Sequence, residues 1–190
     1  MAIDRKAEII KAATESFSLY GYKNTTIDQV ARLANVGKGT IYTFFKNKEE
    51  LFNEIVFTLF DDMQKTANEA TRKDRPFREN VHHALFNMLE YRREHQLMIK
   101  LFQEKRDLGT PAVQTIIEKF EQSILSFIEQ KVNLAIERGE IRDCDSRITA
   151  FIILKLYIAL IFDWENYHDP LTKEDIANLF EFYLFHGLSR

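Results

Sequence analysis

The scarcity of turn-forming residues is the feature that most restricts the fold of this chain. Its 190 residues include only six glycines and three prolines. A many-stranded protein needs frequent tight turns, and glycine and proline supply most of the backbone conformations that such turns require. Apolar residues instead recur at intervals of three and four, which is the repeat of an amphipathic helix. The sequence therefore predicts an all-α fold.

Capping residues and helix breakers divide the chain into nine expected helices. Gly21 follows the first of them at a position where a left-handed backbone costs glycine little. Thr26 and Gln29 have the spacing of a capping box, and Asn47 with Glu50 has the same spacing. The expected helices are 5–20, 26–34, 38–45, 47–72, 77–94, 95–106, 111–138, 148–166 and 172–187.

The second and third expected helices are both short, and only Asn35-Val36-Gly37 separates them. Two short helices joined by such a turn form a helix-turn-helix, whose second helix lies in the major groove of DNA. Asn35 tolerates left-handed backbone, and Gly37 is an acceptable N-cap. We expect a DNA-binding domain over residues 1–48, with the motif at about 26–45, and a second helical domain over residues 49–190.

Side chains that suit DNA gather around the second helix of this motif. Gly39 has no side chain, so the backbone can approach a duplex closely, while its neighbours carry donors for base edges or phosphates. Lys48 adds a positive charge beside a helix N-terminus that can hold a phosphate. The donors beside Gly39 are Lys38, Thr40, Tyr42 and Thr43.

The charge distribution agrees with this hypothesis. Residues 1–48 contain eight Lys and Arg against four acidic residues, a net charge of +4 within a chain of net charge −3, so the remainder carries −7. A basic segment joined to an acidic one is typical of a nucleic-acid module attached to another domain. The alternative is a three-helix packing unit that never touches DNA, which would leave the cluster of donors beside Gly39 unexplained.

Two segments resemble the TetR family of one-component regulators. They are GYKNTTIDQVA (21–31) and VGKGTIYTFFKNKEEL (36–51). The resemblance implies a nine-helix homodimer whose last two helices form a four-helix bundle with those of the partner. It also implies a repressor that binds a palindromic operator and is released by an effector. It assigns DNA contacts to Thr26, Lys38, Gly39, Thr40, Tyr42, Thr43 and Lys48.

This sequence departs from the family pattern at two positions of the motif. Asn35 stands where the family commonly has glycine, and Gly37 stands where it commonly has serine. The first change is conformationally mild. The second removes a hydroxyl that could bind a phosphate, so we expect an effect on affinity but not on function.

The second domain is rich in phenylalanine, with twelve of the sixteen Phe after residue 52. Large rings together with a few polar groups are typical of a small-molecule pocket, although the same rings could simply fill a core. We expect a small apolar or amphipathic effector, aromatic or acyl-like. The candidate pocket residues are Phe60, His82, Phe86, Tyr91, Phe102, Phe120, Phe127 and Tyr157.

The two helices nearest the C-terminus are strongly apolar. Apolar surface that one subunit does not bury must be covered by a partner, which favours a two-fold homodimer. The candidate dimerisation residues are Phe151, Leu160, Leu179 and Tyr183.

An enzyme or a metal site is the main alternative in another class. Glu79 with His82, and Glu165 with His168, have the Glu-x-x-His spacing of di-iron bundles. The second pair lies at a helix end beside Pro170, which is a poor place for a rigid site. His82 and His83 point about 100° apart on a helix. We predict no catalytic role, no cofactor and no metal.

The remaining sequence features bear on location and redox state. The only cysteine, Cys144, excludes an internal disulfide, and a thiol without a resolving partner is more often inert than redox-sensing. We see no signal peptide, and the apolar run at 148–162 is interrupted by Lys155 and is shorter than a bilayer requires. The expected protein is thus a cytoplasmic, ligand-responsive repressor that binds double-stranded operator DNA as a homodimer.

Overall fold

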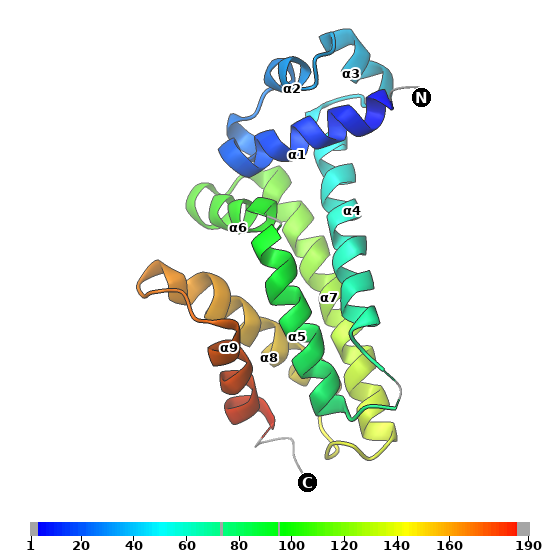
Figure 1. Ribbon diagram of the computed structural model, residues 1–190, viewed down its shortest axis with the longest axis vertical. Helices are drawn as coiled ribbons and strands as arrows, with labels where there is room; N and C mark the ends of the chain where they lie inside the picture. Colours follow the sequence, from blue (N-terminus) through cyan, green and yellow to red (C-terminus); the bar gives the residue numbers. More distant parts are fainter. Residues whose placement is uncertain (1–3, 73, 95, 186–190) are drawn as a thin grey trace. The chain divides into compact units, whose positions relative to one another are not determined.

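The computed structural model describes residues 4–72, 74–94 and 96–185, and over these residues every regular element is helical (Figure 1). This confirms the predicted all-α fold and its nine helices. The helices are α1 (Arg5–Asn24), α2 (Ile27–Leu33), α3 (Lys38–Phe44), α4 (Lys48–Glu69), α5 (Phe77–Glu94), α6 (Gln96–Leu108), α7 (Pro111–Glu137), α8 (Ser146–Ile158) and α9 (Lys173–Phe180). Short π-helical turns follow α8 (Ala159–Asp163) and α9 (Glu181–Phe185), and a 3₁₀ turn covers Trp164–Asn166.

The ends of α1 and α4 differ from the expected ones. Gly21 has the positive φ that its position predicts (80°), but its ψ of 169° is extended, and helical turns resume as far as Asn24. The α4 helix ends three residues earlier than predicted, because the Asn80 side chain binds the backbone of Arg72 and Arg75 and closes a turn there. The expected end of the last helix, 186–187, lies outside the described residues.

The chain packs as two compact units. The first unit contains the residues up to Asp62 together with Arg92–Glu118, and the second contains Met63–Tyr91 and the residues from Lys119 onward. A packing unit is not a functional domain, so the boundary expected at residue 48 stays a prediction. The first unit nevertheless holds the whole helix-turn-helix segment together with α6.

Aromatic packing between α1 and α4 forms the core of the first unit. The Phe17 and Phe52 rings meet edge to face with centroids 5.3 Å apart, and the Tyr22 ring lies 4.5 Å from Phe52. Phe17 and Phe52 are fully buried. The α1 helix also packs on α2 and α3 on one side and on α6 on the other, so it is the central element of this unit (Figure 1).

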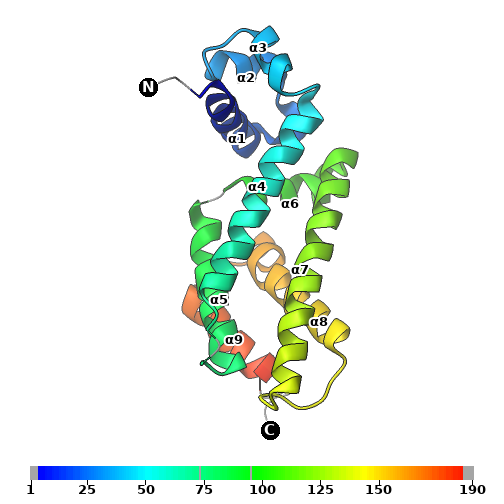
Figure 2. The same ribbon diagram turned by 90° about the vertical axis from the view of Figure 1, so that its right-hand side faces the viewer.

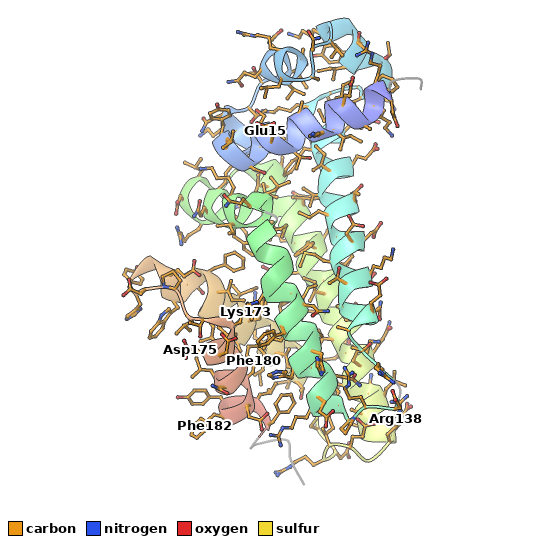
Figure 3. All side chains as sticks on the ribbon, in the orientation of Figure 1. Glu15, Arg138, Lys173, Asp175, Phe180 and Phe182 are labelled. Atoms are coloured by element: carbon orange, nitrogen blue, oxygen red, sulfur yellow. The ribbon has the colours of Figure 1, made fainter. Side chains whose placement is uncertain are left out.

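The second unit has its own apolar core, built from α5, α7, α8 and α9 (Figure 2). Its α9 helix begins at a capping box in which Thr172 and Asp175 each bind the other's backbone N–H. Phe180 of α9 points into the core, whereas Phe182 points away from it (Figure 3). The buried core residues of these helices include Leu85, Leu89, Val132, Ala135, Ile153, Ile176 and Phe180. Leu184, in the π-helical turn after α9, belongs to the same core.

The aromatic cluster gives the first testable prediction. Replacing Phe52 by Ala should lower the free energy of unfolding by about 3–5 kcal/mol, because it leaves a cavity against Phe17 and Tyr22. Phe57 lies on the same helix but is 47% exposed, so Phe57→Ala should cost less than about 0.5 kcal/mol. Urea denaturation of both variants measures the difference. Equal losses would show that the ring cluster does not hold α1 on α4.

Candidate nucleic-acid interface

The turn between α2 and α3 has the geometry of a helix-turn-helix. Asn35 takes a positive φ of 51°, as its residue type permits. The N–H of Val36 binds the carbonyl of Ala31, which closes the turn against α2. Gly37 is the N-cap of α3 and offers no side-chain hydrogen bond to it. The three residues predicted to form the turn therefore do so.

The α3 helix has a buried face and an exposed one. Ile41 is fully buried and Phe45, just after the helix, is 1% exposed, so both anchor α3 in the first unit. On the opposite side Tyr42 is 47% exposed, and Lys38, Gly39 and Thr43 are exposed as well, while Thr40 is half-buried. The face that carries Gly39 and Tyr42 is thus open to solvent in the subunit, as DNA binding requires.

Gly39 keeps the middle of this face bare. A Cβ atom built at Gly39 would meet no heavy atom within 4 Å. The fold of the subunit therefore does not require glycine at this position. Glycine would be required if another molecule approached the α3 backbone closely, because any side chain would fill the space between them.

Lys38 is paired within the subunit. Its Nζ lies 2.8 Å from the Asp28 carboxylate on α2. The hydrogen bond from Lys38 lowers the pKa of Asp28, and the same bond raises the pKa of Lys38. No local pattern predicts this pair, because Asp28 and Lys38 are ten residues apart on different helices. In the free subunit the Lys38 ammonium therefore lies beside the carboxylate of Asp28.

Two of the predicted contact residues bond to their own helices. The Thr26 hydroxyl accepts the Gln29 N–H, and the Gln29 side chain accepts the Thr26 N–H at 2.8 Å, so the predicted capping box is present. The Thr43 hydroxyl donates to the Thr40 carbonyl at 2.7 Å. At the start of α4, the Glu50 N–H donates to Asn47, as its spacing predicts.

Lys48 lies at the joint between α4 and the end of α1. Its Nζ donates to the carbonyls of Tyr22 (2.8 Å) and Thr25 (2.9 Å), and it lies 4.3 Å from the centroid of the Tyr22 ring. Partial burial lowers the pKa of Lys48. An ammonium group has three N–H donors, and these two carbonyls use two of them. The sequence did not reveal this structural role.

Comparison with known proteins identifies the class. The sequence profile described as bacterial regulatory proteins, tetR family, matches residues 9–55. The HTH-type transcriptional regulator YhgD of Bacillus subtilis is 60% identical over 189 residues, which are 100% of this chain and 99% of YhgD. With the exposed α3 face, this similarity defines a helix-turn-helix transcriptional regulator.

Solved structures agree with the fold. The transcriptional regulator FadR from Bacillus subtilis, crystallised with stearoyl-CoA, superposes with a TM-score of 0.77 at 19% identity, covering 91% of this chain and 96% of FadR. AibR, crystallised with isovaleryl coenzyme A and operator DNA, superposes with a TM-score of 0.68 at 22% identity, covering 92% and 95%. The chain belongs to the tetR family of bacterial regulatory proteins.

The structure brings only some of the predicted effector residues together. Phe60 and Phe102 lie in the first unit, and the others lie in the second. His82 is exposed and stacks on half-buried Phe86 with ring centroids 5.3 Å apart, while Phe120 is buried. Phe127 and Tyr157 are half-buried. Tyr91 lies outside the residues whose side chains the structure describes.

The predicted dimerisation residues differ in exposure. Phe151 and Tyr183 are 51% and 67% exposed, whereas Leu160 and Leu179 are half-buried. Across the described residues, no three His, Cys, Asp or Glu side chains are grouped so that they could hold a metal ion. None of the helices described is both long and apolar enough to cross a membrane.

Gly39 provides a test that separates folding from binding. Gly39→Leu should leave the unfolding free energy unchanged or slightly higher, because leucine favours a helix and the space is open. DNA affinity should fall by more than about tenfold, the effect of about 1.4 kcal/mol, because the new side chain keeps the backbone from the groove. Fluorescence anisotropy with labelled DNA measures the affinity. The control Thr58→Leu places leucine at an exposed position of α4 and should bind normally. Normal DNA binding by both variants would show that Gly39 does not lie in the DNA interface.

The Asp28–Lys38 pair predicts a titration. Because Lys38 lowers the pKa of Asp28, the pair persists at neutral pH and is lost only as the pH falls through that lowered value. The Asp28 carboxyl followed by NMR should titrate below the range of an isolated aspartate in the wild type. In Lys38→Met the midpoint should return toward that range. An unchanged midpoint in the variant would show that the pair does not form in solution.

Proposed function

We propose that this regulator is a ligand-responsive repressor that binds a palindromic operator as a homodimer and is released by a small amphipathic effector. The single observation that carries the DNA-binding part is the exposed α3 face around Gly39, opposite the buried anchors Ile41 and Phe45. A helix whose outer face is bare, flanked by donors and open to solvent suits the major groove.

The DNA contacts fall into two groups. Lys38 and Tyr42 project from the exposed face near the start of α3, and Thr40 and Thr43 lie beside them, so this group reads base edges. Thr26 and Lys48 flank α3 at the starts of α2 and α4, and this group binds phosphates, which position the protein on the duplex. Lys38 must exchange Asp28 for DNA on binding.

Exposed apolar side chains of the second unit support a homodimer. Large apolar groups left in solvent on neighbouring elements indicate a surface that a partner covers. A two-fold axis would place two α3 helices about 34–36 Å apart, or a multiple of it, to match the half-sites of a palindrome. The exposed large apolar residues of α8 and of the π-helical turn after α9 are Ile148, Phe151, Ile152, Phe182 and Tyr183.

The effector proposed is an acyl-CoA thioester. The phenylalanine-rich second unit suits an apolar chain, and its half-buried rings include Phe86, Phe127 and Tyr157. Two proteins of the same fold carry acyl-CoA ligands: stearoyl-CoA in FadR and isovaleryl coenzyme A in AibR. An acyl-CoA is amphipathic, which is the ligand chemistry that the sequence predicts. A regulator of transcription acts where the chromosome lies, so a cytoplasmic location accompanies this proposal.

Selection of binding sites from random double-stranded DNA tests the proposal. We expect the purified protein to enrich a palindrome, and Lys38→Met to change the preferred bases within it. Adding long-chain and short-chain acyl-CoA to the selected complex should release the DNA at micromolar concentration. Free coenzyme A is the control and should not release it.

Three outcomes would contradict parts of the proposal. Failure to enrich any sequence would favour a packing unit that does not bind DNA. Enrichment of a single asymmetric half-site would contradict binding as a two-fold homodimer. Release by free coenzyme A as readily as by its thioesters would show that the protein does not recognise the acyl chain of the effector.

A further inference from the structure

A buried carboxylate on α6 binds the backbone at the end of α1. Glu104 is 4% exposed. Its Oε2 accepts the Tyr22 N–H at 2.6 Å, and its Oε1 accepts the Lys23 N–H at 2.9 Å and the Thr110 hydroxyl at 2.8 Å. All of these residues belong to the first unit. A charge this deeply buried is stable only while such donors surround it, so Glu104 and the end of α1 hold each other in place.

Gly21 is the residue that makes room for this carboxylate. A Cβ atom at Gly21 would lie 2.4 Å from Oε2 of Glu104, and the φ of 80° there is one that side chains with a Cβ rarely adopt. A side chain at position 21 and the bound carboxylate therefore exclude each other. The carboxylate of Glu104 can bind here only because Gly21, 83 positions away in the sequence, has no side chain.

The same stretch of backbone is held from its other side by Lys48. Glu104 accepts the Tyr22 N–H, while Lys48 donates to the carbonyls of Tyr22 and Thr25. Within the five residues from Gly21 to Thr25, the Glu104 carboxylate thus binds two backbone N–H groups, and the Lys48 ammonium binds two backbone carbonyls. The negative charge of Glu104 also opposes the lowering of the Lys48 pKa by burial.

We propose that Glu104 is a positioning residue for DNA binding: through the Gly21–Thr25 backbone it holds the Lys48 ammonium where a DNA phosphate can reach it. The inference rests on the proposed function, because it assumes the Lys48 contact. It adds a residue on α6, outside the helix-turn-helix, on which DNA affinity depends. If Glu104 withdraws, the segment shifts, the carbonyls that orient Lys48 move with it, and the phosphate contact is lost.

A double-mutant cycle in the full-length protein tests this coupling. Glu104→Gln keeps the shape but replaces one acceptor by a donor and removes the charge. It should weaken binding to the selected operator by about tenfold, the same order as Lys48→Met. Adding Glu104→Gln to Lys48→Met should cost less than about twofold more, because the two residues act through one contact. Independent losses that multiply would overturn the proposal.

The salt dependence separates positioning from general destabilisation. Loss of one phosphate contact should reduce the slope of log K against log salt by about 0.9 in both single variants. A role confined to stability would weaken binding without changing the slope. Glu118→Gln makes the same charge change at an exposed position of the same unit and should keep the wild-type affinity and slope. An equal change of slope in this control would show that the change in Glu104→Gln comes from net charge, and it would contradict the proposal.

Two further measurements keep the test decisive. If circular dichroism shows that Glu104→Gln is unfolded, Thr110→Val removes one hydrogen bond from the same carboxylate and should lower the affinity by about threefold. Normal affinity in a folded Thr110→Val would then count against the proposal. Wild-type protein that selects no operator would refute the proposed function itself. A wild type that binds DNA alongside a folded, unaffected Glu104→Gln would refute only the present inference.

Discussion

The burial of Ile41 and Phe45 is the interaction on which the presentation of α3 depends. A helix of seven residues is too short to be stable alone, so α3 exists because its inner face packs on α1 and α2. The packing of Phe17 against Phe52 in turn fixes α1 on α4. The orientation of the α3 outer face is therefore set from within the first unit, by apolar contacts that never reach the surface.

The charged residues expected to meet DNA already have partners in the free subunit. Lys38 binds Asp28, and Lys48 binds two carbonyls. Such pairs lower the entropic cost of ordering long side chains on binding, although DNA must compete with them. The exposed Asp28–Lys38 pair is easily exchanged, because a pair in high dielectric contributes little stability. Half-buried Lys48 depends more on its neighbours, and so its position is sensitive to Glu104.

The matched family profile and the buried carboxylate lie in different parts of the chain. The tetR profile ends at residue 55, so it accounts for the helix-turn-helix and the start of α4. Glu104 lies beyond it, on a helix whose buried residues are otherwise apolar: Leu97, Met98 and Leu101. A single carboxylate on such a face is costly unless it does something that an apolar residue cannot, which is to accept backbone N–H groups.

The sequence alone determined the features that depend on residues three or four positions apart. The capping box at Thr26, the cap at Asn47, the turn at Asn35–Gly37 and the nine helices follow from local spacing. In the part of the chain that the structure describes, each of them is confirmed. The tertiary structure decided which distant groups meet. The Glu104–Tyr22 bond joins residues 82 positions apart, and the Lys48–Tyr22 bond joins residues 26 apart. No local pattern encodes these pairs, because they depend on how whole helices pack after the helices have formed.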